Sequence, residues 1–216
     1  MPNRTLVSQR EELRGILLAQ RQPKSGRALR ELIGKVRARV VDAVLKDPQV
    51  TERLAGTRYR VVGTDMSEEK PSGDTKMARR LGEVGVYDYD RNVLVVPVIA
   101  LRTGQVVTIE ERRGVQPSLT PEEVAEAKKI AFSDPAFRSL ARYRQLDIVA
   151  FPARAAFAES HAAFGHRCFA LYFWTRSKPP KRLAAAMIDL SAQQVVPGDP
   201  DDPAIIQEPQ TERLPT

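Results

Sequence analysis

The chain has 216 residues, of which 42% are hydrophobic, and this composition excludes a disordered chain. A length of this order is typical of one or two small domains. The net charge of +7 arises within residues 1–40, which hold ten basic and three acidic residues, so the rest of the chain is electrically balanced.

From this sequence we expect no signal segment and no membrane span. The polar start of the chain does not resemble an apolar leader, and no apolar run is long enough to cross a bilayer. The single cysteine, Cys168, cannot form an internal disulfide. We therefore expect a cytoplasmic protein.

A basic arm is expected at the start of the chain, over residues 1–25. Ser8 and Glu11 have the spacing of a capping box, which predicts a short amphipathic helix over residues 8–20. A second helix is predicted to end near Lys46, because apolar residues recur at three- and four-residue spacing. Those residues are Leu29, Leu32, Ile33, Val36, Val40 and Val44.

Short strands and turns follow in the next part of the chain. Strands are predicted over residues 58–62, 84–89, 93–101 and 105–111. The charged segment 67–76 contains Pro71 and Gly73 and reads as a loop, and residues 90–92 read as a hairpin turn.

Thr120 begins the clearest helix signal in the chain. Pro121 suits the first helical position, and Glu123 completes a capping box with Thr120. The helix is predicted over residues 121–132, followed by strands over 146–151, 167–175, 183–190 and 194–196.

One seven-residue word occurs twice. Residues 101–107 read Leu-Arg-Thr-Gly-Gln-Val-Val and residues 190–196 read Leu-Ser-Ala-Gln-Gln-Val-Val, and an Asp-Pro pair precedes each at a similar distance, at Asp47 and at Asp134. Internal repeats of this kind indicate duplicated architecture. We expect an α+β protein with two modules, residues 26–113 and 114–196, each with one helix packed on an antiparallel sheet of about four strands.

Residues 197–216 form the remaining segment. They contain five prolines and five acidic residues, with Ile205 and Ile206 as the only apolar pair. This composition predicts an extended acidic tail without a core of its own, able to dock on the body or to serve as a ligand for a partner.

The order of a strand hairpin, a Pro-Ser-Leu-Thr-x-x-Glu helix start, an Asp-Pro pair and further strands resembles a known family. Residues 26–196 are similar to the small N-terminal cystatin-like α+β domains of copper amine oxidases, in which one helix lies over a curved antiparallel sheet. The resemblance implies two tandem cystatin-like modules.

The sequence departs from that family where its chemistry resides. The family's quinone cofactor matures from a Tyr in an Asn-Tyr-Asp/Glu word, whereas Asn3 and Asn92 are followed here by Arg4 and Val93. The family's copper needs three His, and this chain has two. We therefore expect no cofactor and no enzymatic activity from this resemblance.

Two other groups of residues have chemistry of their own. His161, His166 and Cys168 are weak candidates for a metal site or, with Cys168 as nucleophile, for an active site. Their spacing is not a standard metal motif, and Cys168 reads equally as a buried strand residue. Asp88 and Asp90 are a possible carboxylate pair, although residues 90–92 suit a turn.

A protein-interaction or accessory role, with a protein partner or a second copy, is the leading expectation. In the aromatic strand 167–175, Phe169, Leu171 and Phe173 should share one face, and Tyr172 and Trp174 the other. One face should be core, and the other could be an exposed patch for a partner or a small ligand, with Tyr172, Trp174 and the following Arg176 as the candidate partner-binding residues. Basic residues of the N-terminal region are further candidates for binding protein or, alternatively, nucleic acid. They are Arg10, Arg14, Arg21, Arg27, Arg30, Arg37 and Arg39.

Overall fold

The computed structural model describes residues 26–69, 79–143, 146–153 and 161–197. The predicted arm helix, Arg10, Arg14, Arg21 and nearly all of the acidic tail lie outside these residues. The described chain divides into two compact units. The first contains the chain up to Asp88 together with Val93–Arg112. The second contains Tyr89–Asn92 and the chain from Arg113 onward.

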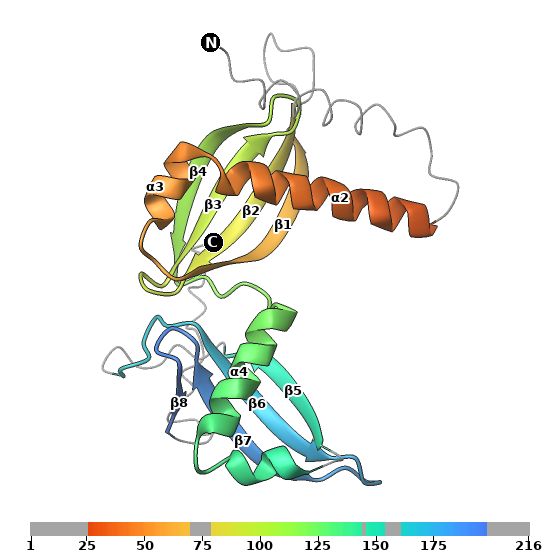
Figure 1. The fold of residues 1–216 in the computed structure, drawn as a ribbon, viewed down its shortest axis with the longest axis vertical. Coiled ribbons are helices and arrows are strands. Elements are labelled where there is room, and N and C mark those ends of the chain that lie inside the picture. Colours follow the sequence, from red (N-terminus) through yellow and green to blue (C-terminus); the bar gives the residue numbers. More distant parts are fainter. Residues whose placement is uncertain (1–25, 70–78, 144–145, 154–160, 198–216) are drawn as a thin grey trace, which may run out of the picture. The chain divides into compact units, whose positions relative to one another are not determined.

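In the first unit, α2 (Gly26–Leu45) lies across one face of a sheet, as Figure 1 shows. Val40 and Val44 on α2 are buried in the core with Val84, Val95 and other sheet residues. Ile33 was expected on the same apolar face but is 38% exposed. The helical periodicity is correct, and among the side chains of α2 that the structure describes, the buried ones are Val40 and Val44, toward the C-terminal end.

A second helix, α3 (Pro48–Leu54), was not predicted from the sequence. Asp47 does more than end the preceding helix, because its side chain accepts a hydrogen bond from the Gln49 N–H at 2.9 Å and caps α3. Pro48 suits the first turn of α3, where no backbone N–H is needed. Val50 and Leu54 then bury the short helix in the core.

The first sheet is an antiparallel meander in the order β1-β2-β3-β4. Its strands are β1 (Tyr59–Glu69), β2 (Arg79–Asp88), β3 (Val93–Ala100) and β4 (Gln105–Arg113). The prediction of a loop from residue 67 was wrong at its start, because β1 runs to Glu69. The almost continuous apolar character of β3 is matched by its burial, with only Ala100 half-buried.

The second unit packs α4 (Pro121–Ser133) across another four-stranded antiparallel sheet, in the order β5-β6-β7-β8 (Figure 1). A 3-10 helix, η1 (Arg138–Arg142), follows α4. The strands are β5 (Leu146–Pro152), β6 (Cys168–Thr175), β7 (Arg182–Asp189) and β8 (Gln194–Val196). The helix and all four strands of this unit agree with the prediction to within one residue or two.

The repeated seven-residue word forms the same turn in both sheets. Each copy joins a strand to the next, and its fourth residue has a left-handed backbone, with φ of 68° at Gly104 and 55° at Gln193. The first residues, Leu101 and Leu190, are both buried. The word therefore encodes a turn and a strand start.

No helix among the described residues is long and apolar enough to cross a membrane.

Candidate binding surface of the second sheet

The strand β6 presents different side chains to the two faces of its sheet. Phe169, Leu171 and Phe173 are fully buried. Phe173 packs between two rings of the helical layer, with centroid distances of 5.9 Å to Phe132 and 5.8 Å to Phe137. These residues form the core beneath α4, as the alternation predicted.

The opposite face of the sheet is divided into a covered part and an open part. The covered part is a small apolar cluster of buried residues at the start of β6: Ala153, Ala163, Cys168, Met187 and Val196. Beyond it, the face carries larger side chains that are not fully buried. We call this open part the outer patch, and its residues are Val149, Phe151, Tyr172, Trp174 and Arg182.

The outer patch lines an open groove of about 510 Å³. Val149 and Phe151 are 41% and 51% exposed, and Tyr172 and Trp174 are half-buried. Singly exposed apolar residues are ordinary, but a contiguous apolar and aromatic patch is typical of an interaction site.

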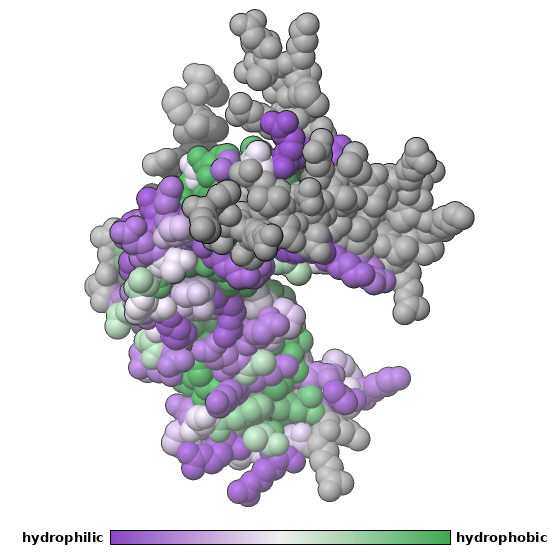
Figure 2. Space-filling view, turned by 45° about the horizontal axis from the view of Figure 1, so that its top comes forward, coloured by the Kyte–Doolittle hydropathy of each residue, from purple (hydrophilic) through white to green (hydrophobic). Residues whose placement is uncertain are grey.

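Figure 2 shows one face of the molecule, on which hydrophilic side chains (purple) predominate and hydrophobic ones (green) gather in smaller areas.

The strand register holds the outer patch together. Val149 lies opposite Tyr172, and Trp174 lies opposite Arg182. The rings of Phe151 and Tyr172 meet edge to face, with centroids 5.8 Å apart. The Arg182 guanidinium stands over the Tyr172 ring at 5.9 Å. The side chains thus come from three neighbouring strands and are fixed by contacts with each other.

Positive charge borders one end of the outer patch. The connection from β6 to β7 contains Arg176, Lys178 and Lys181, and β7 begins with Arg182; we call residues 176–182 the basic hairpin. The Arg176 Nε donates to the Asp147 carboxylate at 2.7 Å, and both side chains are exposed. The surface therefore combines an apolar centre with a cationic edge.

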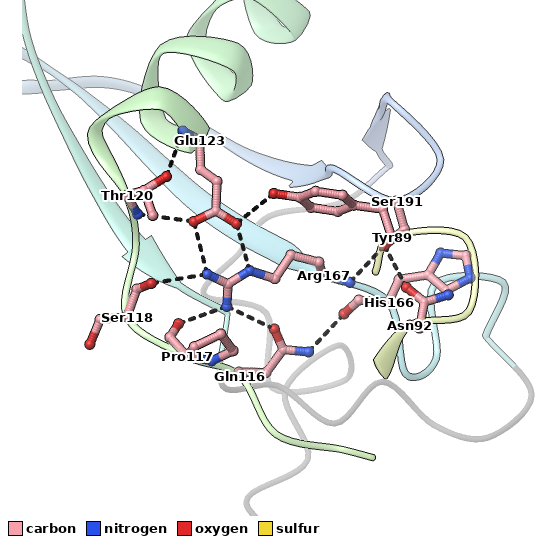
Figure 3. Close-up of polar contacts among 10 residues, drawn as sticks. All are labelled: Tyr89, Asn92, Gln116, Pro117, Ser118, Thr120, Glu123, His166, Arg167 and Ser191. Atoms are coloured by element: carbon pink, nitrogen blue, oxygen red, sulfur yellow. Dashed lines mark hydrogen bonds and ion pairs between the residues drawn. The ribbon is translucent and has the colours of Figure 1, made fainter. Parts of the chain in front are cut away.

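A buried ion pair joins α4 to the sheet on the other side of β6 (Figure 3). Arg167 precedes β6, and its side chain is fully buried with that of Glu123. The guanidinium donates from Nε and Nη2 to the two Glu123 oxygens at 2.9 and 3.0 Å. Its remaining N–H groups reach the carbonyls of Pro117 and Ser118 and the side chain of Gln116.

Glu123 has four hydrogen-bond donors. Besides the two from Arg167, the Tyr89 hydroxyl and the Thr120 backbone N–H donate at 2.9 Å each. Burial acts to raise the pKa of Glu123, but the Arg167 hydrogen bonds and charge, with help from Thr120 and Tyr89, hold this pKa below its usual value. Glu123 is therefore an ionised carboxylate with a structural role, because the four donors occupy its acceptor positions.

Sequence reasoning identified the capping box of Thr120 and Glu123 but missed its partner Arg167. An arginine at the start of a strand reads as a surface residue, since arginine is almost never fully buried unless it is paired. The capping box is present, with the Thr120 hydroxyl accepting from the Glu123 N–H at 3.1 Å.

The three candidate metal ligands do not meet at a common site. His161 Nδ1 accepts from the Ala163 N–H at 3.0 Å. His166 Nδ1 lies 2.6 Å from the buried Asp189 carboxylate. Within the described parts of the chain, no group of three His, Cys, Asp or Glu side chains could hold a metal ion.

Cys168 begins β6 with a buried side chain, as its interpretation as a core residue required. Burial, with the negative charge of Asp189, raises the pKa of its thiol, which is opposite to what a nucleophile needs. The pairing of Asp88 with Asp90 is also unsupported, because Asp88 is fully buried at the end of β2 and Asp90 is exposed in the turn.

The candidate partner-binding arginines have different outcomes. Arg27 and Arg30 lie in α2, but their side chains are outside what the structure describes. Arg37 on α2 is exposed and Arg39 is half-buried. Tyr172 and Trp174 lie in the outer patch, and Arg176 lies beside it. The structure thus brings the aromatic candidates together.

Comparison with protein families and with curated proteins finds no match to this sequence. A solved structure that is similar to this chain is the copper-containing benzylamine oxidase from Hansenula polymorpha, with a TM-score of 0.50 and 13% sequence identity. The match covers 73% of this chain and 27% of the oxidase. It shows a distant likeness of fold alone, between an α+β chain and an amine oxidase.

Proposed function

We propose that this chain is a non-catalytic accessory protein that binds another protein through the outer patch. The observation that carries the proposal is the aromatic, half-open face of β5, β6 and β7 opposite α4. Tyr, Trp and Arg dominate the energetics of protein interfaces, and the outer patch contains all three, at Tyr172, Trp174 and Arg182.

The form of the groove favours a protein ligand over a small molecule. Five side chains from three strands line an open groove, whereas small ligands are usually enclosed in a concave site with a few convergent polar groups. Aromatic rings fixed by edge-to-face contact lose little side-chain entropy on binding. An extended segment or a sheet face of a partner fits this geometry.

The architecture that we assign to this function is a pair of cystatin-like modules in tandem. Each unit has a helix across a four-stranded antiparallel meander, and the repeated seven-residue word forms the same turn in both. The likeness to an amine oxidase supports this assignment at the level of fold. The absence of the quinone-forming word and of a third histidine from these 216 residues supports a role without that enzyme's chemistry.

A second candidate function is nucleic-acid binding through the basic N-terminal region. It is favoured by one observation, the confinement of the whole net charge to residues 1–40. Phosphate contacts release counterions, so binding of this kind would weaken steeply with rising salt. A titration of labelled single- and double-stranded nucleic acid at two salt concentrations separates the two candidates.

The test of the proposed function compares three forms of the chain in capture from native extract treated with nuclease. Phe151→Asp places a charge in the outer patch, and Val107→Asp places the same charge at an equally exposed apolar residue of β4. A protein that the original chain and Val107→Asp retain, and that Phe151→Asp loses, supports the proposal. Equal capture by all three forms contradicts it.

A further inference from the structure

We propose that the chain's own C-terminal tail occupies the outer patch, and that a partner must displace it. The docking segment is Asp201–Glu208, with Ile205 and Ile206 against Tyr172 and Trp174. Because it concerns regulation of the same surface, this inference rests on the proposed function. Docking of the tail is measured in an experiment of its own.

The chain leaves the second sheet in the direction that this docking requires. Strand β8 is antiparallel to β7, with Asp189 opposite Gln194 and Met187 opposite Val196. A chain that continues past Val196 therefore runs toward the Arg182 end of β7. That is the end at which β7 contributes to the outer patch.

The length of the tail is sufficient. From Met187 to Arg182 the strand covers about 17 Å at ~3.3 Å per residue, and the step from β8 to β6 adds about 10 Å. The nine residues from Val196 to Ile205 reach up to about 30 Å when extended. Val196 also belongs to the covered part of the same face, so the last residue of β8 lies on the face that carries the outer patch.

Tail and surface are complementary in chemistry. Around Ile205 and Ile206, the tail carries Asp199, Asp201, Asp202 and Glu208. The outer patch is apolar at its centre, and the basic hairpin places Lys178, Lys181 and Arg182, all exposed, at its edge. An apolar pair flanked by carboxylates matches an aromatic groove flanked by cations. A short tether also gives the tail a millimolar effective concentration, so modest contacts suffice.

Docking of the tail can be followed by the fluorescence of Trp174, because Trp174 is the only tryptophan in the chain and it lies in the outer patch. Removing residues 198–216 from the purified chain should shift the Trp174 emission to longer wavelength and increase its quenching by acrylamide. Full-length Ile205→Asp/Ile206→Asp should behave like the truncation. Removing only residues 212–216, which lie beyond the docking segment, should change neither property.

A synthetic peptide of residues 198–211 provides the second arm of the test. Added to the chain that ends at Pro197, it should reverse the emission shift saturably, and more weakly at high salt because exposed charges are screened. In the full-length chain the emission should not depend on protein concentration, which distinguishes docking within one molecule from docking between two copies.

Identical Trp174 emission and quenching in the full-length and truncated chains would overturn the proposal. Because the purified chain contains no partner, that result would leave partner capture by the outer patch standing. If the tail does dock, the chain lacking residues 198–216 should capture more partner than the full-length chain. Loss of capture in Phe151→Asp tests the partner itself.

Discussion

Arg167 and Glu123 form a fully buried, bidentate ion pair between the residue before β6 and the first turn of α4, with N···O distances of 2.9 and 3.0 Å. Glu123 also completes the capping box of α4, so one carboxylate serves both the start of the helix and the sheet. The pair fixes how α4 begins on the sheet whose opposite face carries the outer patch.

Breaking this pair should strongly destabilise the second unit. Arg167→Met leaves the Glu123 carboxylate buried without its cation, and losses of this kind cost about 3–5 kcal/mol. Urea unfolding followed by circular dichroism measures the change. Arg176→Met is the matched control, because it removes the cation of an exposed pair, and it should cost no more than about 1 kcal/mol.

The Glu123→Gln/Arg167→Met double variant completes a thermodynamic cycle. Since the two side chains share hydrogen bonds, we expect the losses of the single variants to differ from additivity by about 0.5–3 kcal/mol. Additive losses would show that Arg167 acts mainly through the carbonyls of Pro117 and Ser118.

Stability should fall at acid pH because of Glu123. Its pKa in the folded chain is lowered from the ordinary value of 4.5, so its contribution is complete above that value and is lost as pH falls through the lower folded pKa. Unfolding free energies from pH 7 to pH 3 should therefore fall more steeply for the original chain than for Glu123→Gln. If the unfolding free energies of the original chain and of Glu123→Gln fall in parallel with pH, the acid destabilisation comes from other groups.

The repeated turn allows a paired substitution test. Gln193 holds a left-handed backbone that Gly104 holds in the other copy, and such a conformation costs a non-glycine residue about 1–2 kcal/mol. Gln193→Gly should raise the unfolding temperature, and Gly104→Gln should lower it. If both substitutions lower it, side-chain contacts of Gln193, such as its 3.2 Å hydrogen bond to Glu126, outweigh the backbone strain.

Cys168 should be chemically silent in the folded chain. Its side chain is only 2% exposed, and burial raises its pKa, so little thiolate is available at neutral pH. Reaction with a disulfide reagent such as dithionitrobenzoate should be slow without denaturant and immediate in guanidinium. Rapid stoichiometric reaction of the native chain would restore Cys168 as a candidate nucleophile.

The second unit was largely predictable from the sequence, because its signals are local. The Thr120 capping box begins α4, and alternation in β6 separates Phe173 from Tyr172 and Trp174. The orientation of the aromatic residues could therefore be derived, but their neighbours could not. Val149, Phe151 and Arg182 reach the outer patch through strand pairing, which depends on register and not on nearby sequence.

The features that the sequence did not predict were missed for physical reasons. Strand β1 continues through Asp65 to Glu69 because its ladder is made by main-chain hydrogen bonds, which polar residues do not interrupt. The helix α3 was missed because the Asp47-Pro48 pair, which ends one helix, also begins the next. Arg167 was missed because the groups that accept hydrogen bonds from its guanidinium lie 44 or more residues away in sequence.

Binding of a partner by the outer patch is tested by comparing Phe151→Asp with Val107→Asp in partner capture, after both variants have been shown to unfold at the temperature of the original chain. Phe151 and Val107 are 51% and 56% exposed, so neither change removes core packing. We expect a specific protein to be retained by Val107→Asp and lost by Phe151→Asp. Retention of that protein by Phe151→Asp would contradict the outer patch as its binding surface.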